Sequence, residues 1–122
     1  MDILRSLETH SCVSAYEVQV YRHWSVGFYF KLKVNLIDGS ELHAREYLDA
    51  DERDYSFHWQ TAEGQLISRW DNAPHHRMVA TYPHHRHTED GIIESTGITL
   101  DAVLEVIQSQ LCLTPKPPHG LG

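Results

Sequence analysis

Residues 28–48, FYFKLKVNLIDGSELHAREYL, decide the fold of this 122-residue chain. Apolar side chains at 28, 30, 32, 34 and 36 alternate with Tyr29, Lys31, Lys33 and Asn35. A period of two residues indicates a β-strand with one buried face. Asp38-Gly39 is typical of a tight turn, and apolar residues at 42, 44 and 48 continue the alternation after it. Strands joined by so short a turn must be antiparallel.

The same alternation extends outward in both directions. It occurs at residues 16–20 and 55–60, and a turn at 62–64 leads into a further strand at 66–70. Residues 71–91 show no period and predict a long loop, after which 92–94 are a candidate edge strand. Thr99 is a candidate cap for a helix whose apolar stripe comprises Leu100, Val103, Leu104, Ile107 and Leu111, and residues 2–9 are a candidate short helix. We therefore predict an α+β fold: a single twisted antiparallel meander sheet of about five strands, with the C-terminal helix, and the short N-terminal helix if it forms, packed on one face.

Length and composition predict one globular domain, residues 1–113, followed by a disordered tail, 114–122, with three prolines and two glycines. The chain has no apolar run of about 20 residues and no signal-peptide layout, and its two cysteines are too few for a disulfide scaffold. We expect a cytoplasmic protein that does not contact membranes. The net charge of −7 argues against a broad nucleic-acid footprint, but leaves room for a small basic site.

Such a basic region exists at residues 69–87, RWDNAPHHRMVATYPHHRH. It holds five of the ten histidines and three arginines against one acid, Asp71. Histidine titrates near neutral pH, so it can transfer protons, bind metal or contact phosphate. We therefore place the functional site in this histidine-rich segment.

Alternation also predicts what the sheet presents on its uncovered face. If the apolar positions face the core, the opposite face carries Lys31, Lys33, His43, Arg45, Tyr47 and His58, and the histidine-rich segment could fold over it. The alternative is a solvated face with no ligand. Glu46 breaks the alternation, since it shares parity with Ala44. Either a bulge or local bend resets the register there, with the bend favoured, or the carboxylate faces inward and is paired.

The histidines admit three interpretations. They could bind metal together with Asp71, although no recognised ligand spacing is present. They could act as acid and base on RNA: a neutral imidazole takes a proton from a ribose 2′-OH, a protonated one gives a proton to the leaving oxygen, and arginine stabilises the phosphate charge. They could also hold the loop through hydrogen bonds to backbone carbonyls.

Several blocks resemble a known family. His58-Trp59-Gln60, RWDNAPHH at 69–76 and PHHRH at 83–87, with DGS at 38–40 and REY at 45–47, are similar to the TumE family of toxin components from prokaryotic type II toxin–antitoxin systems. The resemblance covers about residues 16–110, and Thr99-Leu100 begins the last helix much as in that family. Residues 77–80, RMVA, depart from it, since family members often carry a second proline and acidic residues there. The resemblance implies a small toxin with a cognate antitoxin, often a helix-turn-helix DNA-binding protein, and does not settle the reaction.

The leading hypothesis is a toxin that acts on RNA as a small metal-independent endoribonuclease without a cofactor. The candidate catalytic residues are His75, His76, His84, His85 and His87, with Asp71 orienting an imidazole, and the candidate substrate-binding residues are Arg69, Arg86, His58, Arg45 and Lys33. The alternative is a non-enzymatic metal-binding or protein-interaction domain, with zinc or another divalent ion held by His75, His84 and His87.

Overall fold

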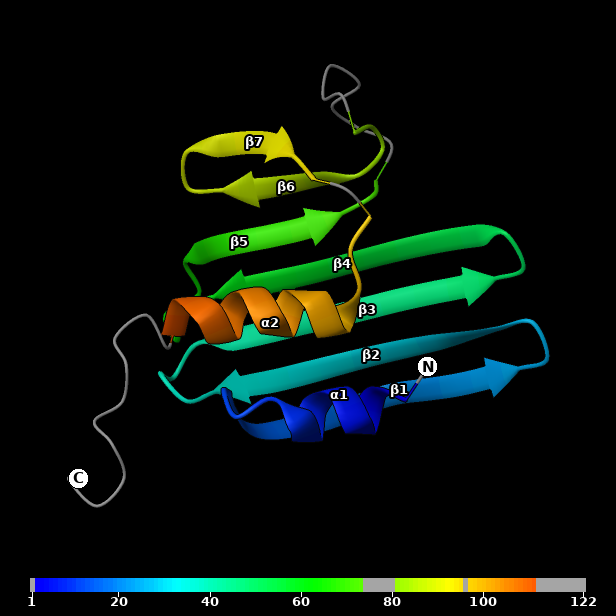
Figure 1. Cartoon of the computed structure of the whole chain (residues 1–122), viewed down its shortest axis with the longest axis horizontal. Coiled ribbons are helices and arrows are strands. Elements are labelled where there is room, and N and C mark those ends of the chain that lie inside the picture. Colours follow the sequence, from blue (N-terminus) through cyan, green and yellow to red (C-terminus); the bar gives the residue numbers. More distant parts are fainter. Residues whose placement is uncertain (1, 74–80, 96, 112–122) are drawn as a thin grey trace.

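The computed structural model describes residues 2–73, 81–95 and 97–111, and in them one sheet of seven strands in chain order, each antiparallel to the next (Figure 1). The strands are β1 (Val13–Trp24), β2 (Gly27–Leu36), β3 (Glu41–Asp49), β4 (Glu52–Gln60), β5 (Leu66–Asp71), β6 (His85–Thr88) and β7 (Gly91–Glu94). The predicted α+β class and antiparallel meander are confirmed. The predicted number of strands, about five, is wrong.

The missing strand is β6, which lies inside the segment predicted to be a loop. Its sequence, HRHT, contains no apolar residue, so it has no alternation to detect. It is a strand because its backbone pairs with β5 on one side and β7 on the other. β7 confirms the candidate edge strand at 92–94 and begins one residue earlier.

Two helices, α1 (Ile3–Thr9) and α2 (Leu100–Leu111), lie on the same side of the sheet (Figure 1). The Asp2 carboxylate accepts a hydrogen bond from the Arg5 N–H at 3.1 Å, and the Thr99 hydroxyl accepts one from the Ala102 N–H at 3.2 Å, so both helices are capped. The core between helices and sheet consists of Ile3, Leu7, Cys12, Phe30, Leu32, Val34, Leu36, Leu42, Ala44, Tyr55, Phe57, Trp59, Trp70, Leu100, Val103, Leu104 and Ile107. We call this side of the sheet the helix face and the other side the open face.

Glu46 faces inward and is paired. Only 5% of its surface is exposed, and Arg53 donates from Nε to its Oε2 at 2.8 Å. The register of β3 with β4 runs through this position without a shift, so no bulge is present at Glu46. The ion pair compensates the buried charge at Oε2 without disturbing the ladder, while Oε1 is buried and has no hydrogen-bond partner among the described residues.

None of the helices in the described ranges is long and apolar enough to cross a membrane. Residues 112–122, which include the predicted tail, lie outside the described residues.

Candidate functional site

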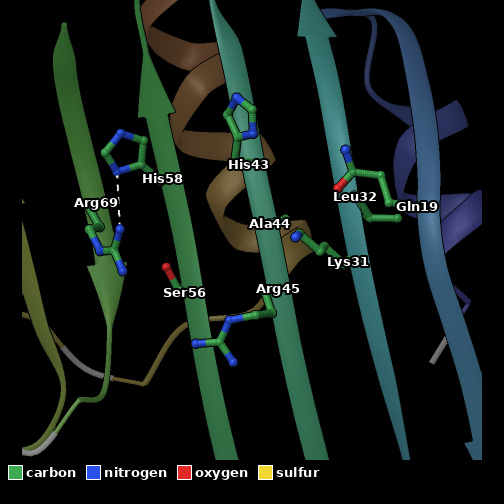
Figure 2. Close-up of a pocket in the computed structure, with 9 residues that line it drawn as sticks. All are labelled: Gln19, Lys31, Leu32, His43, Ala44, Arg45, Ser56, His58 and Arg69. Carbon is green, nitrogen blue, oxygen red and sulfur yellow. Dashed lines mark hydrogen bonds between the residues drawn. The ribbon is translucent and has the colours of Figure 1, made fainter. Parts of the chain in front are cut away.

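The open face is hollowed by a cavity of about 400 Å³, which we call the cup. It is lined by Gln19, Lys31, Leu32, His43, Ala44, Arg45, Ser56, His58 and Arg69 (Figure 2). Figure 2 shows the polar side chains of the central strands in front of the sheet, with α2 behind it. Alternation along β2, β3 and β4 predicted this orientation for Lys31, His43 and Arg45.

Two imidazoles meet in the cup. His43 in β3 and His58 in β4 are directly opposite in the register, so their Cβ atoms lie about 5 Å apart. His43 places Nε2 3.0 Å from Oε1 of Glu41. A carboxylate only accepts, so this nitrogen carries a proton.

His58 meets a cation instead of a carboxylate. Its Nδ1 lies 3.4 Å from Nη1 of Arg69, which can only donate, so this Nδ1 presents its lone pair and the ring proton lies on Nε2. Desolvation by burial lowers the pKa of His58 below 6.5, and the charges of Arg69 and His43 lower it further, against a smaller opposing effect of the Gln60 hydrogen bond. The ring is therefore neutral at pH 7, with a basic nitrogen next to a guanidinium group.

A buried carboxylate holds Arg69 in this position. Asp71 is 4% exposed, and its Oδ2 accepts from Arg69 Nε at 3.0 Å. Its Oδ1 accepts from the Ala73 N–H at 3.0 Å and lies 2.9 Å from His85 Nε2. His85 Nδ1 lies 2.8 Å from the Pro83 carbonyl oxygen. Both ring nitrogens of this 2% exposed histidine thus face acceptors.

His87 joins the same carboxylate from the more exposed side. Its Nε2 lies 3.5 Å from Asp71 Oδ2, its side chain is 26% exposed, and its ring centroid is 4.7 Å from that of His85. One ligand atom from each of these three residues can be chosen so that all lie within 4.8 Å of one another. They therefore form a possible metal-binding group beside the cup.

His84 lies apart from this group. Its Nδ1 is 2.8 Å from the hydroxyl of Tyr55, a residue of the buried core on the helix face, and the two rings stack at 5.8 Å. Desolvation by burial lowers the pKa of His84, and the charges of Arg53 and His85 lower it further. The structure does not bring His84 into the cup.

Arg86 also lies on the helix face. It is opposite Trp70 in the β5–β6 register, its guanidinium carbon is 4.7 Å from the centre of that ring, and its Nε donates to Ser68 Oγ at 2.6 Å. Burial lowers the pKa of Arg86. Because residues 85 and 87 point to the opposite side of β6, Arg86 is separated from the histidines on both sides of it in sequence.

The remaining candidates divide into three groups. Arg45 lines the cup and pairs with the exposed Asp54 at 3.2 Å. Lys33 lies beside the cup, 3.9 Å from Glu41. His75 and His76 lie outside the described residues.

The sequence-based list of site residues omitted some that line the cup. Lys31 and His43 were recognisable by alternation, but Gln19 was not. Gln19 lies where the β1–β2 register shifts between Val18 and Val20, and this bulge adds a residue at the edge of the cup. β-Bulges of this kind often re-aim side chains near functional sites.

The cup combines three cationic side chains, Lys31, Arg45 and Arg69, with two imidazoles of different environment. Guanidinium and ammonium groups bind phosphate, and a neutral imidazole beside a protonated one can transfer protons. The arrangement is suited to a phosphate-bearing substrate.

One of three comparisons with known proteins supports the resemblance to the TumE family. Neither the curated proteins nor the solved structures gave a match to this chain. The family model described as Toxin TumE matches residues 3–111, a range that runs from the start of α1 to the end of α2. This chain therefore belongs to the TumE family of toxins, whose members act beside a cognate antitoxin.

Proposed function

We propose that this toxin cleaves RNA in the cup by acid–base catalysis, without a cofactor. The observation that carries the proposal is the His43–His58 pair, in which one ring is held by a carboxylate and the other lies beside a guanidinium group. Glu41 accepts the proton on His43 Nε2, while Arg69 lies at the lone pair of His58 Nδ1, so the two rings present different groups to a substrate. Two such rings supply the acid and the base that RNA cleavage requires.

In the proposed reaction Arg69 Nη1 turns from His58 Nδ1 to the phosphate, and Nδ1 then accepts the proton of a ribose 2′-OH. The O2′ atom then forms a bond to the adjacent phosphorus, and the bond from phosphorus to O5′ breaks. The imidazolium of His43 gives its proton to O5′. The products are a 2′,3′-cyclic phosphate and a free 5′-hydroxyl, and the two histidines exchange protonation states.

The cations of the cup bind the phosphate in this scheme. Arg69 is fixed through Nε by Asp71, which leaves its Nη atoms directed at the site beside the base. Lys31 has no ion-pair partner within the described parts of the chain, so its charge is available to an incoming anion. Charge that develops on the phosphate oxygens in the transition state is stabilised by donors already in place.

This proposal moves the acid–base role from the histidine-rich segment to the sheet. His85 has both nitrogens directed at acceptors, and His84 lies on the helix face. The predicted roles of His75 and His76 stay predictions. We further propose that the antitoxin is a helix-turn-helix DNA-binding protein and that the toxin acts in the cytoplasm, where its RNA substrates are.

The test is cleavage of a short RNA by the purified toxin in the presence of EDTA. We expect a 2′,3′-cyclic phosphate product, and no cleavage at a position whose ribose is replaced by deoxyribose.

His58→Gln and His43→Gln should each lower kcat by about 10²–10⁴-fold, the usual contribution of one acid or base. His23→Gln is the matched control, since His23 is exposed on β1 and does not line the cup. Wild-type rates in both cup variants, or an intact RNA from cells arrested by the toxin, would overturn the proposal.

The second candidate function is a non-enzymatic metal-binding or interaction domain. The grouping of Asp71, His85 and His87 favours the metal-binding part of that hypothesis. The two candidates separate in cells that lack the antitoxin. Loss of toxicity in a folded His58→Gln variant supports catalysis, whereas retained toxicity supports the non-enzymatic alternative.

A further inference from the structure

We propose that Asp71, His85 and His87 form a binding site for one divalent transition-metal ion of the zinc type. The three residues come from two neighbouring strands: Asp71 ends β5, His85 begins β6, and these two are directly opposite in the register. Two imidazole nitrogens and a carboxylate oxygen are a donor set that zinc and related ions prefer. The inference does not depend on the RNA-cleavage proposal.

The spacing of the donor atoms fits shared coordination. Ligand atoms about 2.0–2.2 Å from a tetrahedral ion lie roughly 3.4 Å from one another. His85 Nε2 lies 2.9 Å from Asp71 Oδ1, and His87 Nε2 lies 3.5 Å from Asp71 Oδ2. The first separation is that of a hydrogen bond, and an ion would widen it by about 0.5 Å. The second is long for a hydrogen bond to a carboxylate and already matches two ligands on one ion.

The orientation of His85 also fits a ligand. Its Nδ1 lies 2.8 Å from the backbone carbonyl of Pro83, which fixes the ring and directs Nε2 at the carboxylate. Metal-binding histidines almost always anchor the other ring nitrogen in this way. An ion would take the place of the proton that now lies between His85 Nε2 and Asp71 Oδ1.

His87 is the most exposed of the three proposed ligands. Asp71 and His85 are 4% and 2% exposed, while the His87 side chain is 26% exposed. His87 is therefore the ligand at the entrance, with water as the remaining ligand of a site that has three protein donors.

The ion would act as a clamp between two strands, because Asp71 ends β5 and the paired His85 begins β6. The clamp is not itself part of the cup, but it shares a carboxylate with Arg69, whose Nε lies 3.0 Å from Asp71 Oδ2. Metal binding thus stabilises the β5–β6 ladder next to the proposed catalytic cup.

A second group, His10, Asp101 and Glu105, provides the internal comparison. It joins α1 to α2, its shortest recorded ion pair is 3.8 Å, and its acids are more exposed. A variant in each group therefore shows which of the two groups holds a bound ion.

The experiment is titration of the full chain, freed of metal by EDTA and dialysis, with Zn²⁺ by calorimetry and with Co²⁺ by visible absorption. We expect one ion per chain, a d–d band typical of nitrogen and oxygen ligands, and a higher Tm with Zn²⁺.

His87→Ala should lower the affinity for Zn²⁺ at least tenfold. The metal-free variant should keep the circular dichroism spectrum of the wild type, because this side chain is partly exposed. His10→Ala and His43→Ala should bind as the wild type does. Absence of binding at micromolar ion, unchanged affinity in His87→Ala, or loss of binding in His10→Ala would each overturn the site. These readouts are independent of RNA cleavage, so a failure here is distinguishable from a failure of the proposed reaction.

Discussion

Arg69 Nη1 lies 3.4 Å from His58 Nδ1, across the directly paired positions of β5 and β4. A guanidinium group at this distance opposes protonation of the ring, and it is the second cause, after desolvation, of the low pKa of His58. We predict that Arg69→Gln raises the pKa of His58 toward 6.5, as measured by NMR titration of the imidazole. Arg45→Gln is the control. Arg45 is a cation of the same cup but is not among the causes of the His58 shift, so this variant should leave the pKa of His58 unchanged.

The low pKa of His58 also makes stability depend on pH. Above about pH 6.5 the ring is neutral in both the folded and the unfolded chain, so it adds no pH dependence. As the pH falls below 6.5 the unfolded chain takes up this proton first, and the folded state loses stability until the pH passes below the lowered folded pKa. His58→Gln should therefore lose less stability than the wild type between pH 7 and pH 5 in urea unfolding. A steeper loss in the variant would contradict the sign of the shift.

Asp71 should be the most sensitive carboxylate of the open face. It is buried and accepts from Arg69 and from the Ala73 N–H, with His85 in contact. Asp71→Asn replaces a buried acceptor oxygen by an amide nitrogen that faces the same donors, and we expect a loss of about 2 kcal/mol in the free energy of unfolding. Asp54→Asn, at a side chain 57% exposed, removes the partner of Arg45 and should cost less than about 1 kcal/mol. Equal costs in chemical denaturation would argue against the Asp71 network.

Substitution of Arg86 should affect stability, whereas substitution of Arg45 should affect RNA binding. Arg86 stacks on Trp70 and donates to Ser68 on the helix face, so Arg86→Gln should destabilise the fold by about 1–2 kcal/mol and leave RNA affinity unchanged. Arg45→Gln should leave stability nearly unchanged and weaken RNA binding by about 1 kcal/mol, roughly fivefold in Kd. Fluorescence anisotropy with a non-cleavable 2′-deoxy oligonucleotide measures the affinity. A larger effect on binding for Arg86 would place the phosphate contact on the other face.

Gly27 is required by the close approach of β2 and β3. A Cβ at this position would overlap the backbone carbonyl of Leu48, which cannot move without breaking the ladder. Gly27→Ala should cost about 3 kcal/mol in thermal or urea unfolding. Ser25→Ala, in the exposed turn just before it, should be nearly neutral.

Part of the site was predictable because strand alternation is a local property. Residues such as Lys31, His43 and His58 share a face with their neighbours two positions away, whatever the strand pairs with. Their arrangement in one cup also followed, since short turns force consecutive strands to be antiparallel neighbours. Parity offered an inward Glu46 only as one of the alternatives, and the structure decided for it. Its partner Arg53 could not be predicted, because the pairing depends on the register between two strands.

By itself, the sequence determined the α+β class, the apolar stripe of α2, the faces of most residues of β2, β3 and β4, and the family to which the toxin belongs. Only the tertiary structure decided on which face of the sheet the described side chains of the histidine-rich segment lie. Their closeness in sequence had suggested a single site. Pairing of β6 with β5 places His85 and His87 on the open face with Asp71, Arg86 on the helix face with Trp70, and the preceding turn brings His84 to Tyr55. The physical reason is that a short polar strand has no hydrophobic face of its own. Its orientation comes only from the backbone ladder it joins.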